Sequence, residues 1–171
     1  STTTDFAEFT DTQIGAFNST QLGALSATNF SAIDATTIAG LSATQVKGVT
    51  TTQLSALNAT DIGEFTETQI GAFSTTQLQA LGATNFSALV DTQVAALNTT
   101  QVQGLTTTEL KGLSVTDIGE FLDTQIAALS STQLGALSAT NFSAIDATAI
   151  AALSPTQIKG ITTTQLAGIS V

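Results

Sequence analysis

Threonine stands at position 4 and at every eighth residue after it through Thr164, without one exception. Two apolar columns keep the same period, one beginning at Phe6 and the other three positions later at Phe9. The chain of 171 residues is therefore a run of 21 octads, or eight-residue repeats. Its fold must repeat one small unit from end to end.

A longer period lies over the octads. The segment Asp5-Phe6-Ala7-Glu8-Phe9 returns seven octads later as Asp61-Ile62-Gly63-Glu64-Phe65, and after seven more as Asp117-Ile118-Gly119-Glu120-Phe121. The chain therefore divides into three modules of seven octads, 5–60, 61–116 and 117–171. No linker rich in proline, glycine or charge separates them, and the octad phase never slips. We therefore expect one continuous body over residues 1–171.

The spacing of the apolar residues excludes the two simplest elements. It alternates between three and five positions, and residues three apart in a strand point to opposite faces. In one long helix, an octad turns through about 800°, so the apolar stripe would drift by about 80° per octad.

A very short helix in each octad fits every column. Ser26, Ser42 and Thr50 are typical N-caps, and the residue three positions after such a cap is nearly always Gln, Asn, Asp or Glu. We call that residue the box residue, because it completes a capping box. The residue before the cap and the one four after it form a hydrophobic staple. The only proline, Pro155, follows Ser154 and so falls at the first helical position.

Helices this short are unstable alone, so they must stack on one another. The sequence predicts an all-α solenoid of one- to two-turn helices, one per octad. Three or four octads are needed to enclose a core. A half-integral number, three and a half octads per coil, would place matching octads above one another once in every module. The alternative is a β-solenoid, whose coils also stack identical residues such as threonine in ladders.

The composition excludes several classes of function. The chain has no Cys, His or Arg, a net charge of −10, and only Lys47, Lys111 and Lys159 as bases. Thiol and imidazole catalysis and His or Cys metal sites are thereby excluded, and we expect no enzyme and no cofactor. Three lysines cannot neutralise a nucleic-acid backbone. No apolar run approaches the roughly 18 residues of a membrane span, so we expect no membrane insertion.

The threonine column allows two interpretations. As a structural feature, each threonine occupies the second helical position, where its hydroxyl bonds nearby backbone and its methyl packs between coils. As a functional feature, a regular array of threonines could bind ice or another surface.

Each module also carries three acidic residues at three-residue spacing. Three carboxylates within two turns could bind Ca²⁺ with help from carbonyls and water, or they could simply be solvated surface acids. The trios are Asp5, Glu8, Asp11; Asp61, Glu64, Glu67; and Asp117, Glu120, Asp123.

All the asparagines lie in Asn-x-Ser/Thr triplets, the acceptor pattern for N-glycosylation in exported proteins. Half of them are N-caps two positions before the threonine column, and the others stand in Asn-Phe-Ser. The candidate acceptors are Asn18, Asn29, Asn58, Asn85, Asn98 and Asn141.

Runs such as Thr-Asp-Thr-Gln-Ile-Gly-Ala-Phe (10–17) and Ser-Ser-Thr-Gln-Leu-Gly-Ala-Leu (130–137) resemble the Thr/Gln-rich short repeats of very large secreted bacterial surface proteins. The resemblance implies an adhesin-like or matrix-forming role outside the cell or at its surface, and it carries over no catalytic residue. The first and last octads follow the same pattern as the rest, whereas terminal repeats normally differ. We therefore expect an extracellular spacer that stacks end to end into filaments. The alternative is an ice- or surface-binding module.

Overall fold

The computed structural model describes residues 3–169, and every regular element in that range is an α-helix. The β-solenoid alternative is therefore excluded. Most of the helices have four to six residues, as expected for about one turn per octad. The helices are α1 Thr3–Phe6, α2 Asp11–Gly15, α3 Ser19–Gly23, α4 Ala27–Ser31, α5 Ala35–Gly40, α6 Ala43–Val46, α7 Thr51–Ser55, α8 Ala59–Gly63, α9 Glu67–Ala72, α10 Thr75–Phe86, α11 Asp91–Ala95, α12 Thr99–Gln103, α13 Thr107–Gly112, α14 Val115–Gly119, α15 Asp123–Ile126, α16 Ser131–Ala136, α17 Ala139–Ser143, α18 Ala147–Ala151, α19 Pro155–Ile158 and α20 Thr163–Ala167.

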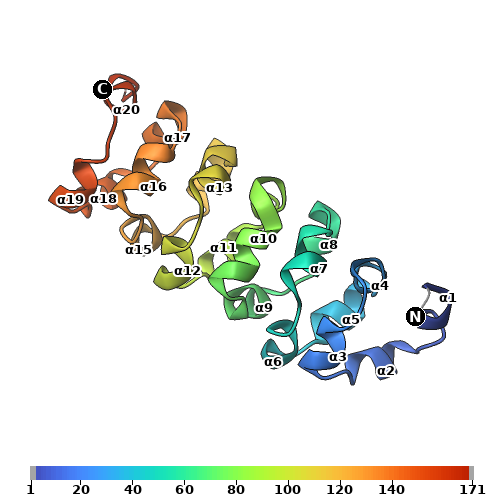
Figure 1. Ribbon diagram of the computed structural model, residues 1–171. Helices are drawn as coiled ribbons and strands as arrows, with labels where there is room; N and C mark the ends of the chain where they lie inside the picture. The colour runs from blue at the N-terminus through green and yellow to red at the C-terminus, as the bar shows by residue number, and fades with distance from the viewer. Residues whose placement is uncertain (1–2, 170–171) are drawn as a thin grey trace.

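The helices follow one another along an elongated body whose described ends lie far apart (Figure 1). Helices three octads apart pack together: α2 lies on α5, α3 on α6, and α17 on α20. This regular packing makes the molecule a solenoid-like repeat protein. No helix within residues 3–169 is both long enough and apolar enough to cross a membrane.

The helix starts confirm the predicted N-caps and capping boxes. At α16, the Ser130 side chain accepts from the Gln133 N–H at 3.2 Å, and the Gln133 side chain accepts from the Ser130 N–H at 2.8 Å. Pro155 occupies the first position of α19, where a missing N–H costs no hydrogen bond. Val90 and Leu122 stand at the cap positions of α11 and α15, and neither side chain offers an oxygen.

The helix α10 is two octads joined at Gly82. This residue has φ 71° and ψ 171°, which are not helical angles, so the segment contains two short helices with a sharp break between them. Gly82 takes the place of the Ser, Thr or Asn cap of other octads. A residue without Cβ adopts this positive φ at no steric cost.

The two apolar columns form one core that runs the length of the body. Leu22, Leu54, Leu78 and Leu134 are fully buried, and the core continues without interruption from Phe6 to Ala149. The side chains predicted to form the hydrophobic staples thus make up the core. Burial on the order of 1.5–3 kcal/mol per large side chain outweighs the poor intrinsic stability of one-turn helices.

Hydrogen bonds between coils give the register of the stacking. The Gln53 Nε2 donates to the carbonyls of Leu25, 28 residues earlier, and Leu22, 31 residues earlier, at 2.9 and 2.7 Å. In the same way, the Gln133 Nε2 donates to the carbonyls of Leu105 and Val102 at 2.8 and 3.0 Å. These carbonyls lie at the end of a short helix, where the helix itself leaves them partly unsatisfied. An offset of 28 residues corresponds to three and a half octads.

Some coils approach so closely that only glycine fits. A Cβ placed on Gly48 would lie 2.2 Å from the Ser19 carbonyl oxygen, and one on Gly160 would lie 2.2 Å from that of Ser131. Both contacts join residues one coil apart, in agreement with the register of the amide bonds.

Candidate functional site

The box residue determines how each coil is joined to the one before it. A glutamine is long enough to accept from its own cap N–H and also to donate to the previous coil, as Gln133 does. The side chains of Asn85 and Asn141 are shorter and make only the bond to the previous coil. Their Nδ2 atoms donate to the carbonyls of Leu57 and Leu113 at 2.7 Å each. The capping box was predictable from the sequence, whereas the bond between coils was not.

Aspartate at the box position is matched by a serine in the previous coil. Asp61 accepts from the Asn58 N–H at 3.0 Å and from the Ser31 hydroxyl at 3.3 Å. Asp117 accepts from the Ser114 N–H at 2.7 Å and from the Ser87 hydroxyl at 2.5 Å. Ser31 and Ser87 occupy the same place in successive modules, so each module carries the partner that the acid of the next module needs.

Glu109 is the only glutamate among the box residues. It is 1% exposed, and one carboxyl oxygen accepts from the Thr106 N–H and hydroxyl at 2.7 and 2.8 Å. The other oxygen, Oε1, is buried and has no hydrogen-bond partner. A glutamine would place its donating amide at this point. Burial raises the pKa of the Glu109 carboxyl, although the bonds from Thr106 oppose the rise.

The acidic trios lie near helix starts and ends as expected, and acids of the previous coil also lie near Glu64 and Glu120. Glu64 and Glu120 are the C-caps of α8 and α14. Burial raises the pKa of Glu64, and repulsion from Asp61 and Asp34 adds to this rise. Burial followed by repulsion from Asp117 and Asp91 raises the pKa of Glu120 in the same way, and Glu120 Oε2 is a buried oxygen without a hydrogen-bond partner.

Other acids pair across coils. The pKa of Asp123 is raised, chiefly because its carboxyl shares a hydrogen bond with Asp146. The pKa of Asp146 is lowered, chiefly by the Ala149 N–H. Among the described residues, no group of three or more acidic side chains converges as a metal site requires. Calcium binding by Asp5, Glu8, Asp11, Asp61, Glu64, Glu67, Asp117, Glu120 and Asp123 stays a prediction.

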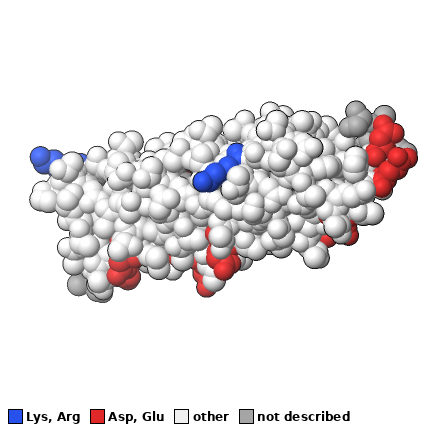
Figure 2. Space-filling view, turned by 90° about the horizontal axis from the view of Figure 1, so that it is seen from below, with Lys and Arg blue, Asp and Glu red and all other residues white. Residues whose placement is uncertain are grey.

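Acidic side chains gather in separate patches at one end and along one long edge of the face seen in Figure 2. The rest of that face is almost uncharged and carries only isolated lysines (Figure 2).

The asparagines of the Asn-Phe-Ser triplets are unsuited to glycosylation in the folded chain. Asn29, Asn85 and Asn141 are at most 7% exposed, and the Nδ2 atoms of the latter two donate to carbonyls of the previous coil. A sugar is attached through that nitrogen and would force the coils apart. Asn18, Asn58 and Asn98 are exposed N-caps, and their glycosylation stays a prediction.

The threonine column lies on the surface. Every member from Thr12 to Thr164 is exposed. These side chains follow the helix starts around the body and along it.

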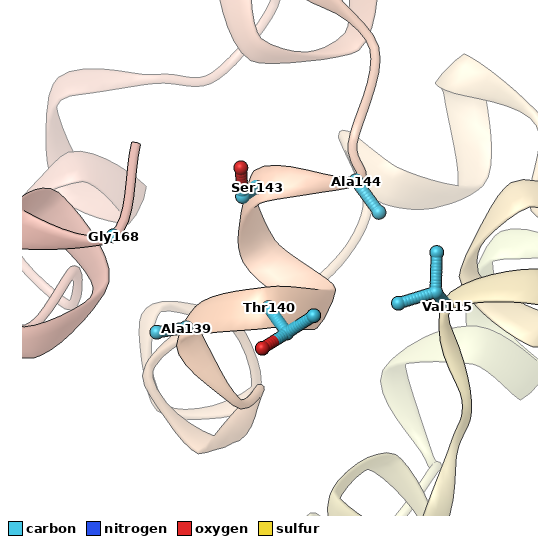
Figure 3. A pocket seen from close by; sticks show the side chains of 6 residues that line it. All are labelled: Val115, Ala139, Thr140, Ser143, Ala144 and Gly168. Atoms are coloured by element: carbon cyan, nitrogen blue, oxygen red, sulfur yellow. The ribbon is translucent and has the colours of Figure 1, made fainter. Parts of the chain in front are cut away.

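Two hollows open near the C-terminal end of the described chain. One, of about 360 Å³, is lined by small and uncharged side chains from α14, the α17 segment and the residue after α20 (Figure 3). Val115 points toward Ala144, while Thr140 and Ser143 bring the only side-chain hydroxyls of that lining (Figure 3). The second, of about 410 Å³, is more apolar and includes Phe142, Ile145 and Ile150. These linings supply packing surface and two hydroxyl groups, but no acid–base pair.

Comparisons of this chain with protein-family models, curated proteins and solved structures found no match.

Proposed function

We propose that this chain is a structural rod of an extracellular or cell-surface protein, in which 21 octads form three modules of two coils each. The uninterrupted core and the packing of helices three octads apart along an elongated body support this proposal most directly. A body built by adding like coils keeps one width as it lengthens.

The lateral surface suits a spacer. It is acidic and sparsely charged, and the interior is a closed, continuous core rather than a cleft for a substrate. Export is supported by the resemblance to secreted bacterial repeats and by the absence of cysteine, which makes the fold independent of redox conditions.

Electron microscopy and sedimentation of the purified chain over a range of concentrations test the proposal. We expect rods that lengthen with concentration and keep a constant width. Compact monomers at every concentration would contradict the self-stacking function.

A second candidate function is binding to ice or another ordered surface through the threonine column. The observation in its favour is that every member of the threonine column from Thr12 to Thr164 is exposed. The arrangement of the column around the body argues against one flat binding face. Thermal hysteresis of the purified chain at millimolar concentration would support this function, and its absence would eliminate the ice-binding version.

A further inference from the structure

Two departures from the repeat meet at one junction between coils of the middle module. Glu109 is the only glutamate among the box residues, and within residues 3–169 Gly82 is the only residue with a positive φ. Gly82 directly follows Leu81, which stands 28 positions before Glu109, the offset of the amide bonds between coils. The helices that contain them, α10 and α13, pack against each other (Figure 1).

The other two modules show the same junction with regular residues. The equivalents of Glu109 are Gln53 and Gln165. Their Nε2 atoms donate to the carbonyls of Leu25 and Leu137 at 2.9 and 2.8 Å. A serine follows each of these leucines, so in both modules the carbonyl of a Leu–Ser peptide faces the box residue of the next coil.

The corresponding peptide of the middle module, Leu81–Gly82, has the opposite orientation. The orientation of a peptide is set by the ψ of its first residue and the φ of its second. One module later, ψ is 144° at Leu137 and φ is −61° at Ser138. Gly82, with φ 71°, is the one residue of α10 whose angles are not helical, so ψ at Leu81 is helical, about −42°. The peptide is therefore turned over, and its N–H takes the side that the carbonyl takes in the other modules.

This orientation requires glycine, and it suits a box residue that can only accept. The angles of Gly82, φ 71° and ψ 171°, lie in a region that glycine alone occupies readily. A Cβ on Gly82 would meet nothing within 4 Å, so the backbone conformation and not the available space requires glycine. The ionised carboxyl of Glu109 has no proton to donate, and a carbonyl turned toward its buried Oε1 would repel it. The two departures thus compensate for each other.

We propose that the Leu81–Gly82 peptide is a two-position switch whose orientation is set by the charge of Glu109. While the carboxyl is ionised, the peptide keeps the orientation of the structure, and Glu109 Oε1 makes no bond to the previous coil. When the carboxyl binds a proton from solvent, its hydroxyl donates and the peptide turns, so that the Leu81 carbonyl accepts as the Leu137 carbonyl does from Gln165. Gly82 allows both states because glycine adopts positive and negative φ about equally well.

The surroundings of Glu109 leave its own titration in control of the switch. Helices α10 and α16 pack against α13 and carry no titratable side chain, and Lys111, the only other charged residue of α13, is exposed. Burial raises the pKa of Glu109 above its ordinary value of 4.5, although the hydrogen bonds from Thr106 oppose the rise. The peptide therefore turns as the pH falls through this raised pKa.

A double-mutant cycle at neutral pH tests the coupling. Gly82→Ser is made in the unchanged chain and in the Glu109→Gln protein, and equilibrium unfolding is measured for all four. In the unchanged chain, serine must take a conformation that suits glycine or turn a carbonyl toward the carboxylate, so the unfolding equilibrium constant should rise about tenfold. In the Glu109→Gln protein both places then have the residues of the other modules, and the change should be less than about twofold.

Gly40→Ser is the matched control for the loss of a glycine. A Cβ on Gly40 would also meet nothing within 4 Å, but its φ is not positive. Its effect should be the same with and without Glu109→Gln. The excess cost of Gly82→Ser in the unchanged chain should disappear as the pH falls through the pKa of Glu109, because the protonated carboxyl donates as a glutamine does.

A crystal structure of the Glu109→Gln protein reads the switch directly and does not depend on the stability of Gly82→Ser. We expect a negative φ at Gly82, near that of Ser138, and a bond from the new amide to the Leu81 carbonyl. A positive φ at Gly82 in that structure would overturn the inference, as would an equal cost of Gly82→Ser with and without Glu109→Gln. The switch lies within one chain, so these outcomes are independent of end-to-end stacking.

Discussion

The glutamine box residues satisfy two groups of backbone atoms that short helices leave without partners. The side-chain oxygen accepts from the cap N–H of its own helix, and the side-chain nitrogen donates to carbonyls at the end of a helix in the previous coil, as in Gln53 and Gln133. Glutamate has the first ability but, when ionised, lacks the second. Glu109 therefore leaves a buried oxygen unpaired where a glutamine would donate.

Glu109→Gln should stabilise the folded chain at neutral pH by about 1–3 kcal/mol, the usual cost of an unsatisfied buried polar group. Burial raises the pKa of Glu109 above its ordinary value of 4.5, so its favourable contribution is complete below that value and is lost as the pH rises through the folded-state pKa. The gain from the substitution should accordingly grow between acidic and neutral pH.

Thermal unfolding of both proteins at several pH values measures this difference. Helices α10 and α16, which pack against α13, carry no charged side chain, so neighbouring titrations do not obscure it. Gln133→Glu is the reverse control and should destabilise. An equal melting temperature for the unchanged chain and Glu109→Gln at neutral pH would contradict the argument.

At the scale of the element, each helix depends on its cap because it has only one turn to stabilise it. Val90 and Leu122 occupy cap positions without a cap oxygen and are 51% and 49% exposed. Val90→Ser and Leu122→Ser should each stabilise the fold by about 1 kcal/mol, the usual value of an N-cap hydrogen bond. Chemical denaturation tests this, and Ser130→Ala should lose a similar amount. Destabilisation by both serine variants would show that packing of these apolar side chains outweighs capping.

The glycines divide into two kinds. A Cβ on Gly48 would overlap the Ser19 carbonyl oxygen at 2.2 Å, whereas one on Gly40, the last residue of α5, would meet nothing within 4 Å. Gly48→Ala should cost about 1–3 kcal/mol through overpacking, and Gly40→Ala should stabilise by roughly 0.5–1 kcal/mol through helix propensity. Equilibrium unfolding of the two variants compares them, and equal stabilities would contradict the close approach of Gly48 to Ser19 in the previous coil.

The short helices could be predicted because their signals lie within one octad. The contacts between coils could not, because they depend on the number of octads per coil. Caps such as Ser154, the staple columns and Pro155 at a first helical position act within one octad, so the sequence alone identifies them. The bond from Gln53 to Leu25, the repulsion between Glu64 and Asp34 and the burial of Asn85 depend on which residues meet across coils. The octad and module periods are compatible with more than one coil size, so these contacts could not be derived.

For the whole molecule, the acids of different coils act together. Glu64 lies near Asp61 and Asp34, and Glu120 lies near Asp117 and Asp91, so like charges repel across the stack. If these acids are solvated and do not form a site, sodium and calcium chloride at equal ionic strength should raise the melting temperature equally by screening. A larger rise with calcium that Glu64→Gln reduces would instead establish a calcium site.

We infer that the chain forms a straight rod in which each module adds the same length. Spin labels at Thr52, Thr108 and Thr164, which are exposed and occupy the same place in successive modules, allow pulsed electron paramagnetic resonance to measure this. With two coils per module and roughly 10 Å per packed layer, the 52–108 distance should be about 20 Å and the 52–164 distance about 40 Å. A 52–164 distance equal to or shorter than the 52–108 distance would contradict the rod.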